Sequence, residues 1–177
     1  MKNLTWFMSV LVILSVSAFT IVSSVAWKVK EGYSVKWEAT TFSGLKASIQ
    51  FNESYPEKSK IIASIDARTI NTGNALKDAH AREALQTSKF PFITFESITI
   101  NKTGMGYETT GNLTLKGVTR RIKFPFVFDS KRTSVHFPFF PSKTFCGVFT
   151  ISPKAFNVTA EGTPEEVTLE LKIPVVQ

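Results

Sequence analysis

The sequence predicts an all-β protein, an antiparallel barrel or sandwich of about eight or nine strands with one short inserted helix. Two observations lead to this fold class. Apolar and polar residues alternate with a period of two along most of the chain after residue 26. Only residues 74–86 clearly break that alternation. Because each pair of successive parallel strands needs a crossover connection, a single helix excludes a parallel β/α array.

The first predicted strand shows the alternation most clearly. In residues 27–37 the aromatic and other apolar side chains occupy odd positions, whereas the lysines at 28, 30 and 36 occupy even positions. Such a strand has one apolar face and one charged face. We expect the remaining strands at residues 47–51, 61–67, 92–100, 107–115, 121–128, 135–139, 145–151, 156–160 and 167–175.

Residues 74–86 are rich in alanine, leucine and charged residues, and they predict a short helix. Thr72 or Asn74 is a suitable N-cap. We expect its buried stripe to contain Leu76, Ala79 and Leu85, and Leu76, Leu85 and Phe90 to seal the helical end of the fold. Further along, residues 116–117 (Lys-Gly) predict a tight two-residue hairpin turn, because glycine permits a positive φ angle.

The composition fits one globular domain and excludes several classes of protein. The chain has 177 residues, of which 43% are hydrophobic, too many for a disordered protein. One cysteine, Cys146, and two histidines, His80 and His136, cannot build the usual Cys/His zinc site, and one thiol cannot form a disulfide within the chain. Cys146 lies in an apolar run, so we expect it to be buried.

The net charge of +7 comes from lysines and arginines that are scattered along the predicted strands. Nucleic-acid binding needs basic residues clustered with aromatic ones, so we expect no nucleic-acid partner. A modest positive field instead favours an acidic membrane surface or an anionic ligand head.

Residues 1–26 are expected to be a signal peptide. Lys2 is their only charge, and an apolar run covers residues 4–26. Ser24 and Ala26 place small residues at the −3 and −1 positions of a signal-peptidase site, which predicts a mature domain of residues 27–177. An uncleaved N-terminal anchor is the alternative, because the apolar stretch is close to the lower limit for spanning a bilayer. Either interpretation places the domain outside the cytoplasm, in the periplasm or secreted.

The side chains of the expected inward face are large and mostly aromatic. They have two interpretations: the rings fill one another as a dry core, or they surround an apolar lumen that holds one small ligand. A structural surface protein would have the filled core. The inward set contains Trp37, Phe51, Phe95, Phe124, Phe126, Phe137 and Phe149.

The predicted helix carries the one group of residues with an acid–base pattern, Asp78, His80, Arg82 and Glu83. A histidine beside carboxylates is a possible general base, but the sequence contains no recognisable nucleophile elbow. We therefore interpret the group as a polar network that ties the helix to the rest of the fold, and we expect no catalytic residues. An enzyme that uses His80 and Asp78 on a lipid head group is the alternative.

Three motifs, in this order along the chain, resemble those of the YceI-like family. They are Lys77-Asp-Ala-His80 on the predicted helix, Phe90-Pro-Phe-Ile-Thr-Phe95, and Leu113-Thr-Leu-Lys-Gly-Val-Thr119. The resemblance covers essentially the whole chain after residue 26. Two features depart from it: Tyr33 stands where the family usually has a histidine, and residues 130–142 diverge.

The resemblance implies a lipocalin-like antiparallel barrel of about eight strands, periplasmic or secreted, whose lumen binds a long isoprenoid lipid or quinone. It implies a binding protein rather than an enzyme, with no metal or cofactor, and family members often form homodimers. We expect the ligand to contact inward residues of several strands. The expected lining residues are Trp37, Ile49, Phe51, Ile65, Phe95, Leu113, Phe124, Phe126 and Phe149.

Overall fold

The computed structural model describes residues 25–129 and 143–177, which form one antiparallel sheet and a few short helices. The strands are β1 (Val25–Val29), β2 (Ser34–Trp37), β3 (Thr40–Phe42), β4 (Lys46–Phe51), β5 (Lys60–Asp66), β6 (Phe92–Thr103), β7 (Gly106–Leu115), β8 (Val118–Asp129), β9 (Lys143–Ile151) and β10 (Val167–Val176). The helices are α1 (Ala75–Ala84) and the 3₁₀ turns η1 (Pro56–Lys58), η2 (Ala67–Thr69) and η3 (Pro153–Phe156). No helix in these ranges is long and apolar enough to cross a bilayer.

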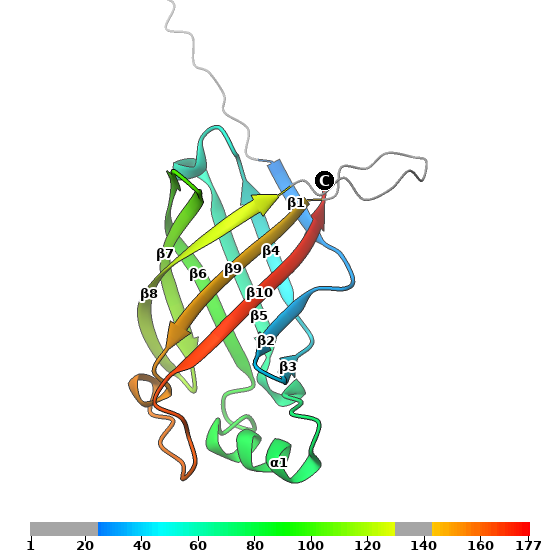
Figure 1. Cartoon of the computed structure of the whole chain (residues 1–177), viewed down its shortest axis with the longest axis vertical. Helices are drawn as coiled ribbons and strands as arrows, with labels where there is room; N and C mark the ends of the chain where they lie inside the picture. Colours follow the sequence, from blue (N-terminus) through cyan, green and yellow to red (C-terminus); the bar gives the residue numbers. More distant parts are fainter. Residues whose placement is uncertain (1–24, 130–142) are drawn as a thin grey trace, which may run out of the picture.

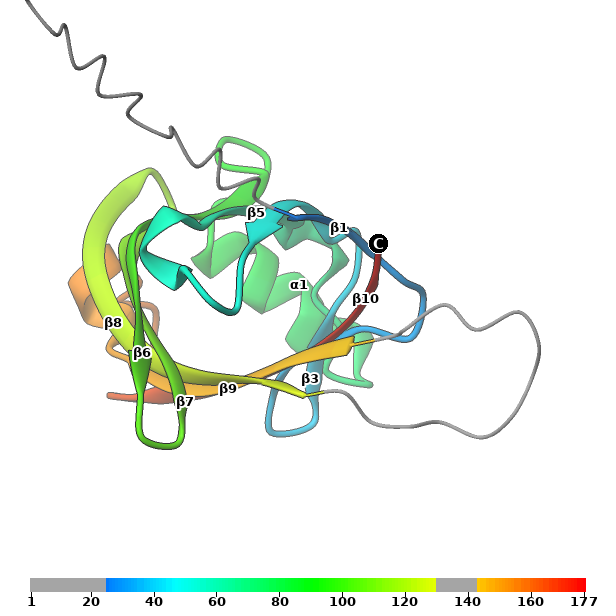
Figure 2. The same cartoon turned by 90° about the horizontal axis from the view of Figure 1, so that it is seen from above.

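The sheet closes into a barrel, which confirms the all-β fold class and decides between barrel and sandwich. The strand order is β1-β4-β5-β6-β7-β8-β9-β10-β2-β3, and β1 also pairs with β10 to complete the ring. The β2–β3 hairpin extends from β10 beside this closure. Helix α1 lies at one end of the barrel (Figure 1), and in the view from above it lies across the ring of strands (Figure 2).

The region predicted as one strand over residues 27–37 forms two strands, β1 and β2, that both pair with β10. Lys28 lies opposite Val176, and Lys36 lies opposite Glu170. The predicted alternation is correct, because Trp27 and Val35 are buried whereas Lys28 and Lys36 are exposed. The strand is interrupted around Gly32, whose φ angle is +83°.

Tyr33, at the position where the resemblance leads one to expect a histidine, has a structural contact. Its hydroxyl accepts a hydrogen bond from the backbone N–H of Leu45 at 3.0 Å. This bond ties the start of β2 to the connection between β3 and β4.

A β-bulge in β6 explains why the sequence of residues 92–100 has apolar residues on both faces. The register with β7 shifts between Ser97 and Thr99, so Ile98 is the extra residue and is 46% exposed. Beyond the bulge Ile100 faces inward and is fully buried. The Ser97 hydroxyl accepts a hydrogen bond from the N–H of Ile61 at 2.8 Å, which satisfies β5 where its pairing with β6 stops.

The hairpin turn between β7 and β8 forms at the predicted Lys-Gly pair. Lys116 and Gly117 both have positive φ angles, +50° and +73°, as a type I′ turn requires. Leu115 and Val118 close the hairpin. Glycine is also needed sterically, because a Cβ atom at Gly117 would lie 2.5 Å from the ring of Phe90.

The barrel end opposite α1 has a packed aromatic core, which we call the filled end. The rings around Phe51 meet it edge to face: Phe51 lies 4.9 Å from Tyr107 and 4.9 Å from Phe128 between ring centroids. The Trp27 indole N–H donates to the Phe51 carbonyl oxygen at 3.1 Å. The buried residues of the filled end are Trp27, Ile49, Phe51, Ile100, Tyr107, Phe126, Phe128, Phe145 and Val175.

Some predicted boundaries differ from the structure. The strand expected at residues 156–160 is wrong: η3 covers its start and Asn157 adopts a left-handed conformation with φ +59°. The strand expected at 135–139, with Phe137, lies outside the described residues. Strand β1 starts at Val25, two residues before the expected signal-peptidase cut, and residues 1–24 of the predicted signal peptide lie outside the described ranges.

Candidate ligand-binding cavity

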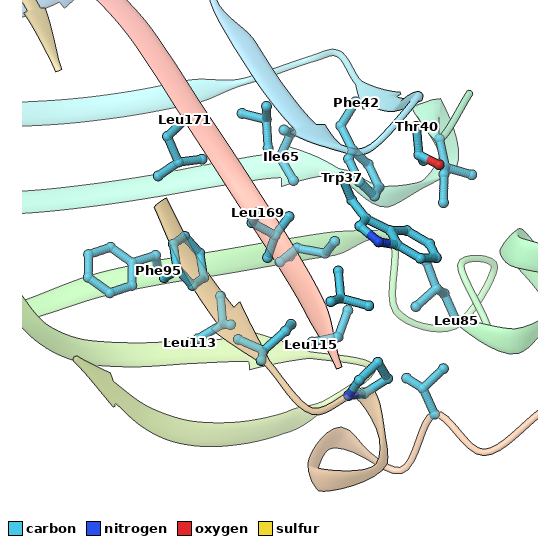
Figure 3. A pocket seen from close by; sticks show the side chains of 18 of the residues that line it. Trp37, Thr40, Phe42, Ile65, Leu85, Phe95, Leu113, Leu115, Leu169 and Leu171 are labelled. Carbon is cyan, nitrogen blue, oxygen red and sulfur yellow. The ribbon is translucent and has the colours of Figure 1, made fainter. Parts of the chain in front are cut away.

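The barrel encloses an apolar cavity between the filled end and α1. Its volume is about 1080 Å³. Strand β10 contributes Leu169 and Leu171 to its wall, and β7 contributes Leu113 and Leu115 (Figure 3). Leu85, which directly follows α1, lines the cavity at its helical end. The same barrel therefore holds a dry core at one end and an open apolar space at the other.

Most of the residues expected to line a lumen do line this cavity. They are Trp37, Ile49, Ile65, Phe95, Leu113, Phe124, Phe126 and Phe149. Phe51 does not line the cavity, and that expectation is corrected: its side chain is 1% exposed and packed among the rings of the filled end. The alternation fixes which face of β4 points inward, but not how far along the barrel a ring lies. Ligand contact by the lining residues stays a prediction.

The boundary between the filled end and the cavity is aromatic. Phe124 stacks on Phe149 with ring centroids 4.5 Å apart, and Phe95 lies 5.4 Å from Phe124. The Phe95 ring occupies its position only because residue 111 is glycine, since a Cβ atom there would lie 2.4 Å from the ring. The absence of a side chain at Gly111 on β7 thus lets the Phe95 ring of β6 lie close to the β7 backbone, where the cavity meets the filled end.

Small and aliphatic residues leave the cavity open below this boundary. Ala63 on β5 and Gly147 on β9 line it with small residues, whereas β9 carries the Phe145 ring at the filled end. Strand β10 adds Leu169 and Ile173 but no aromatic side chain. The open volume therefore follows from side-chain size at a few inward positions rather than from a change in the backbone.

The β2–β3 hairpin contributes residues that sequence analysis missed. Residues 38–40 line the cavity beside the expected Trp37, which lies opposite Thr40 in the hairpin register. Phe42 lies opposite Val35 on the same inner face. The turn is hard to predict, because its left-handed residue is Glu38, with φ +51°, rather than glycine or asparagine. An apolar-polar alternation through residues 35–37 was the only available signal.

Helix α1 closes the other side of the cavity with a different stripe from the one predicted. The Asn74 side chain caps it by accepting from the N–H groups of Leu76 and Lys77 at 3.0 and 3.1 Å, which confirms one of the two predicted caps. Leu76 is 66% exposed and Ala79 is exposed as well, so the predicted burial of both residues is wrong. The cavity-facing residues are Lys77, His80, Ala81, Glu83, Ala84 and Leu85.

Asp78 and His80 do not form a catalytic pair. The Asp78 carboxylate accepts hydrogen bonds from the backbone N–H and the hydroxyl of Thr72, both at 2.7 Å. These bonds hold the pKa of Asp78 below its ordinary value, because they favour the ionised carboxylate. His80 lines the cavity whereas Asp78 does not. The geometry favours the predicted role of Asp78 in tying α1 to the barrel.

The charged side chains that line the cavity come from its helical end and are mixed in sign. Glu38, Glu83 and Glu161 bring three carboxylates, and Lys77 and Lys116 bring two ammonium groups. The Lys116 ammonium already donates to the carbonyl oxygen of Asn157 at 2.8 Å. This end of the cavity therefore carries no excess of positive charge.

Within residues 25–129 and 143–177, no three His, Cys, Asp or Glu side chains lie close enough together to hold a metal ion. Cys146 is only partly buried, so the expectation of full burial is not met.

Comparison with known proteins identifies the family. The sequence model of the YceI-like domain matches residues 20–175. A UPF0312 protein of Yersinia pestis is 35% identical over 152 residues, which cover 82% of this chain and 76% of that protein. A UPF0312 protein of Pectobacterium atrosepticum is 33% identical over 150 residues, covering 81% of this chain and 74% of that one.

Solved structures share the fold at low sequence identity. BcnA of Burkholderia cenocepacia has a TM-score of 0.66 and 22% identity, covering 82% of this chain and 94% of its own. The YCEI protein of Campylobacter jejuni also has a TM-score of 0.66, with 18% identity and coverage of 99% and 93%. A polyisoprenoid binding domain from Saccharophagus degradans has a TM-score of 0.55 and 12% identity, with coverage of 88% and 95%. By its sequence match and its barrel, the chain belongs to the YceI-like domain family.

Proposed function

We propose that this protein binds a lipid with a long isoprenoid tail inside the barrel. The lipid is either an isoprenoid alcohol or a prenyl quinone. The observation that carries the proposal is the apolar cavity of about 1080 Å³ next to a filled aromatic core. A volume of this size lies just above the range of about 300–1,000 Å³ that is usual for ligand pockets. The fold shared with a polyisoprenoid binding domain supports the same ligand class.

The lining suits a branched hydrocarbon. Each isoprene unit that leaves water gains about 25 cal/mol for every Å² of apolar surface buried, so a few units give substantial affinity without polar contacts. Leucine and isoleucine side chains such as Leu113, Leu169 and Ile65 adapt to methyl branches, and the stacked rings of Phe124 and Phe149 form a firm end wall. Tail binding therefore needs only shape and apolar surface from this site.

Binding, rather than catalysis on a lipid head group, is the function that we propose. The enzyme alternative needs Asp78 to orient His80, but Asp78 is engaged by Thr72. We also propose that the protein acts outside the cytoplasm, because residues 1–26 have the charge and small-residue pattern of a signal peptide.

The proposal is tested by extracting the purified protein with organic solvent and analysing the extract by mass spectrometry. We expect an isoprenoid lipid at near-stoichiometric amounts. A cavity-filling variant, Ala63→Phe, places a ring in the open volume opposite Phe95 and should lose the lipid while remaining folded. The matched control is Ile62→Phe, because Ile62 is 46% exposed on the outer face of the same strand. An empty wild-type protein, or equal lipid in both variants, would contradict the proposal.

A further inference from the structure

We propose that signal peptidase cuts this chain upstream of β1, after Ser24 or after Ala18, so that the mature protein keeps Val25 and Ala26. This inference assigns a processing site and rests on the proposed export of the protein. It differs from the cut after Ala26 that the small-residue pattern alone predicts.

The first support is the backbone pairing of residues 25 and 26. Val25 lies opposite Phe51 and Ala26 lies opposite Gln50 in the antiparallel pair of β1 and β4, beside the closure of the barrel (Figure 1). Strand β1 has only five residues, and a cut after Ala26 would remove two of them. The end of β4 would then lose its pairing with β1. Tolerance of such a truncation depends on the burial and hydrogen bonding of the backbone that is removed.

The second support is the contact of Val25 with the filled end. Val25 is partly buried and packs against the residues of that core. The next residue on the same face of β1 is Trp27, which is 5% exposed and donates its indole N–H to the Phe51 carbonyl oxygen. Loss of Val25 would therefore uncover apolar surface of the filled end.

The third support is the charge that each cut would create. Hydrolysis adds one water across the peptide bond and leaves an amino group on the residue that follows the cut. After Ala26 that residue is Trp27, and an α-amino group has a pKa of about 7.7–8.0, so it is mostly protonated at neutral pH. Trp27 lies opposite Ile49, which is 4% exposed.

A cation is already present at this place. The Lys143 ammonium lies 5.9 Å from the centre of the Trp27 ring and pairs with the Glu53 carboxylate. A new ammonium group on Trp27 would lose hydration beside the core and would meet the charge of Lys143. A cut after Ser24 places the amino group on Val25, the first residue of the strand, and leaves the pairing of β1 intact.

The sequence before β1 provides the residues that an earlier cut needs. The apolar core of a signal peptide usually has about 7–15 residues, and residues 4–18 already reach that length. An apolar core that continued to the later cut would exceed it. Ser24 and Ala18 are small residues for the −1 position, with Val22 and Val16 at the −3 positions.

The test expresses the full-length chain in a Gram-negative host and determines the N-terminus of the exported protein by intact-mass measurement and N-terminal sequencing. We expect a mature chain that starts at Val25 or Phe19. Ala26→Leu should be processed at the same residue and to the same extent as the wild type, because leucine blocks only a cut after residue 26 and Ala26 is exposed on β1. The matched variant carries Ala18→Leu and Ser24→Leu together, and we expect it to lose this processing.

The outcomes separate this inference from the proposed export. A mature chain that starts at Trp27, or an Ala26→Leu variant that is no longer cut, would overturn the inference while export stands. Uncleaved protein held in the membrane would overturn it as well. A full-length chain found in the cytoplasm would remove the proposed location, and the inference with it. Cleavage before β1 in the wild type and in Ala26→Leu, lost in the matched variant, supports the assignment.

Discussion

The two ends of the barrel are enclosed by the same strands but differ in what fills them. At the filled end, inward positions of β1, β4, β7, β8 and β9 carry rings that pack against one another. At the helical end, β5 and β10 also line the cavity, and their inward residues are aliphatic or small, such as Leu169 and Ala63. The difference indicates that stability and ligand binding are assigned to different ends of the barrel: the filled end stabilises the fold, and the helical end provides the cavity.

The largest effect is expected from removing a ring at the filled end. Phe51→Ala deletes a side chain that contacts four other rings and is 1% exposed. Because the surrounding rings cannot collapse into the space, we expect a loss of about 3–5 kcal/mol in the free energy of unfolding. Urea denaturation measures it. A loss below about 1 kcal/mol would mean that the filled end is not a tight core.

A matched pair of aliphatic truncations tests the difference between the ends directly. Ile100→Ala, at a fully buried position of the filled end, should cost about 2–5 kcal/mol. Leu169→Ala, on the cavity wall, should cost the ligand-free protein less than about 1.5 kcal/mol, because its side chain already faces open space on one side. Equal costs in urea denaturation would show that the cavity collapses in solution.

Gly111→Ala is expected to have an intermediate effect on stability and a clear effect on the cavity. The new methyl group would lie 2.4 Å from the Phe95 ring and 2.6 Å from the Glu96 carbonyl oxygen, so both the ring and the paired backbone must move. The ring has open space to enter but the backbone does not, and we expect a cost of about 1–3 kcal/mol, the usual range for overpacking. The displaced ring should reduce lipid content in the solvent extract. Unchanged lipid content would place the ligand away from Phe95.

The smallest effect concerns the attachment of α1. The pKa of Asp78 is lowered in the folded protein by its bonds to Thr72, so its carboxylate stabilises the fold above the ordinary Asp pKa, and that stabilisation disappears as the pH falls through the lowered value. Asp78→Asn lacks this titration. Between about pH 5 and pH 2, the melting temperature of the wild type should therefore fall more than that of the variant. Parallel curves would contradict this role, since all other carboxylates titrate alike in both proteins.

The alternation of side chains was enough to predict the fold class and the inward faces. Successive side chains of a strand point to opposite faces, so only two choices exist for which set of residues faces inward. It placed Phe124, Phe126 and Phe149 on the cavity correctly. It could not place Phe51, because position along the barrel axis depends on strand stagger, which no local pattern records.

The missed features depend on contacts between distant segments. The β2–β3 hairpin turns at Glu38, a residue with no intrinsic preference for a positive φ angle, so the chain signals neither the turn nor the inward position of Thr40. The stripe of α1 was predicted from leucines, but Leu76 is exposed, whereas Ala81 and Ala84 line the cavity. Small residues at such sites carry no periodic apolar signal.

The most direct test of a half-filled, half-open barrel is a crystal structure of the protein purified without removal of lipid. We expect continuous, elongated electron density running from the hairpin residues Trp37 and Thr40 to the stacked rings of Phe124 and Phe149, with none among the rings of the filled end. Side chains that close over the cavity and leave no elongated density would contradict the account.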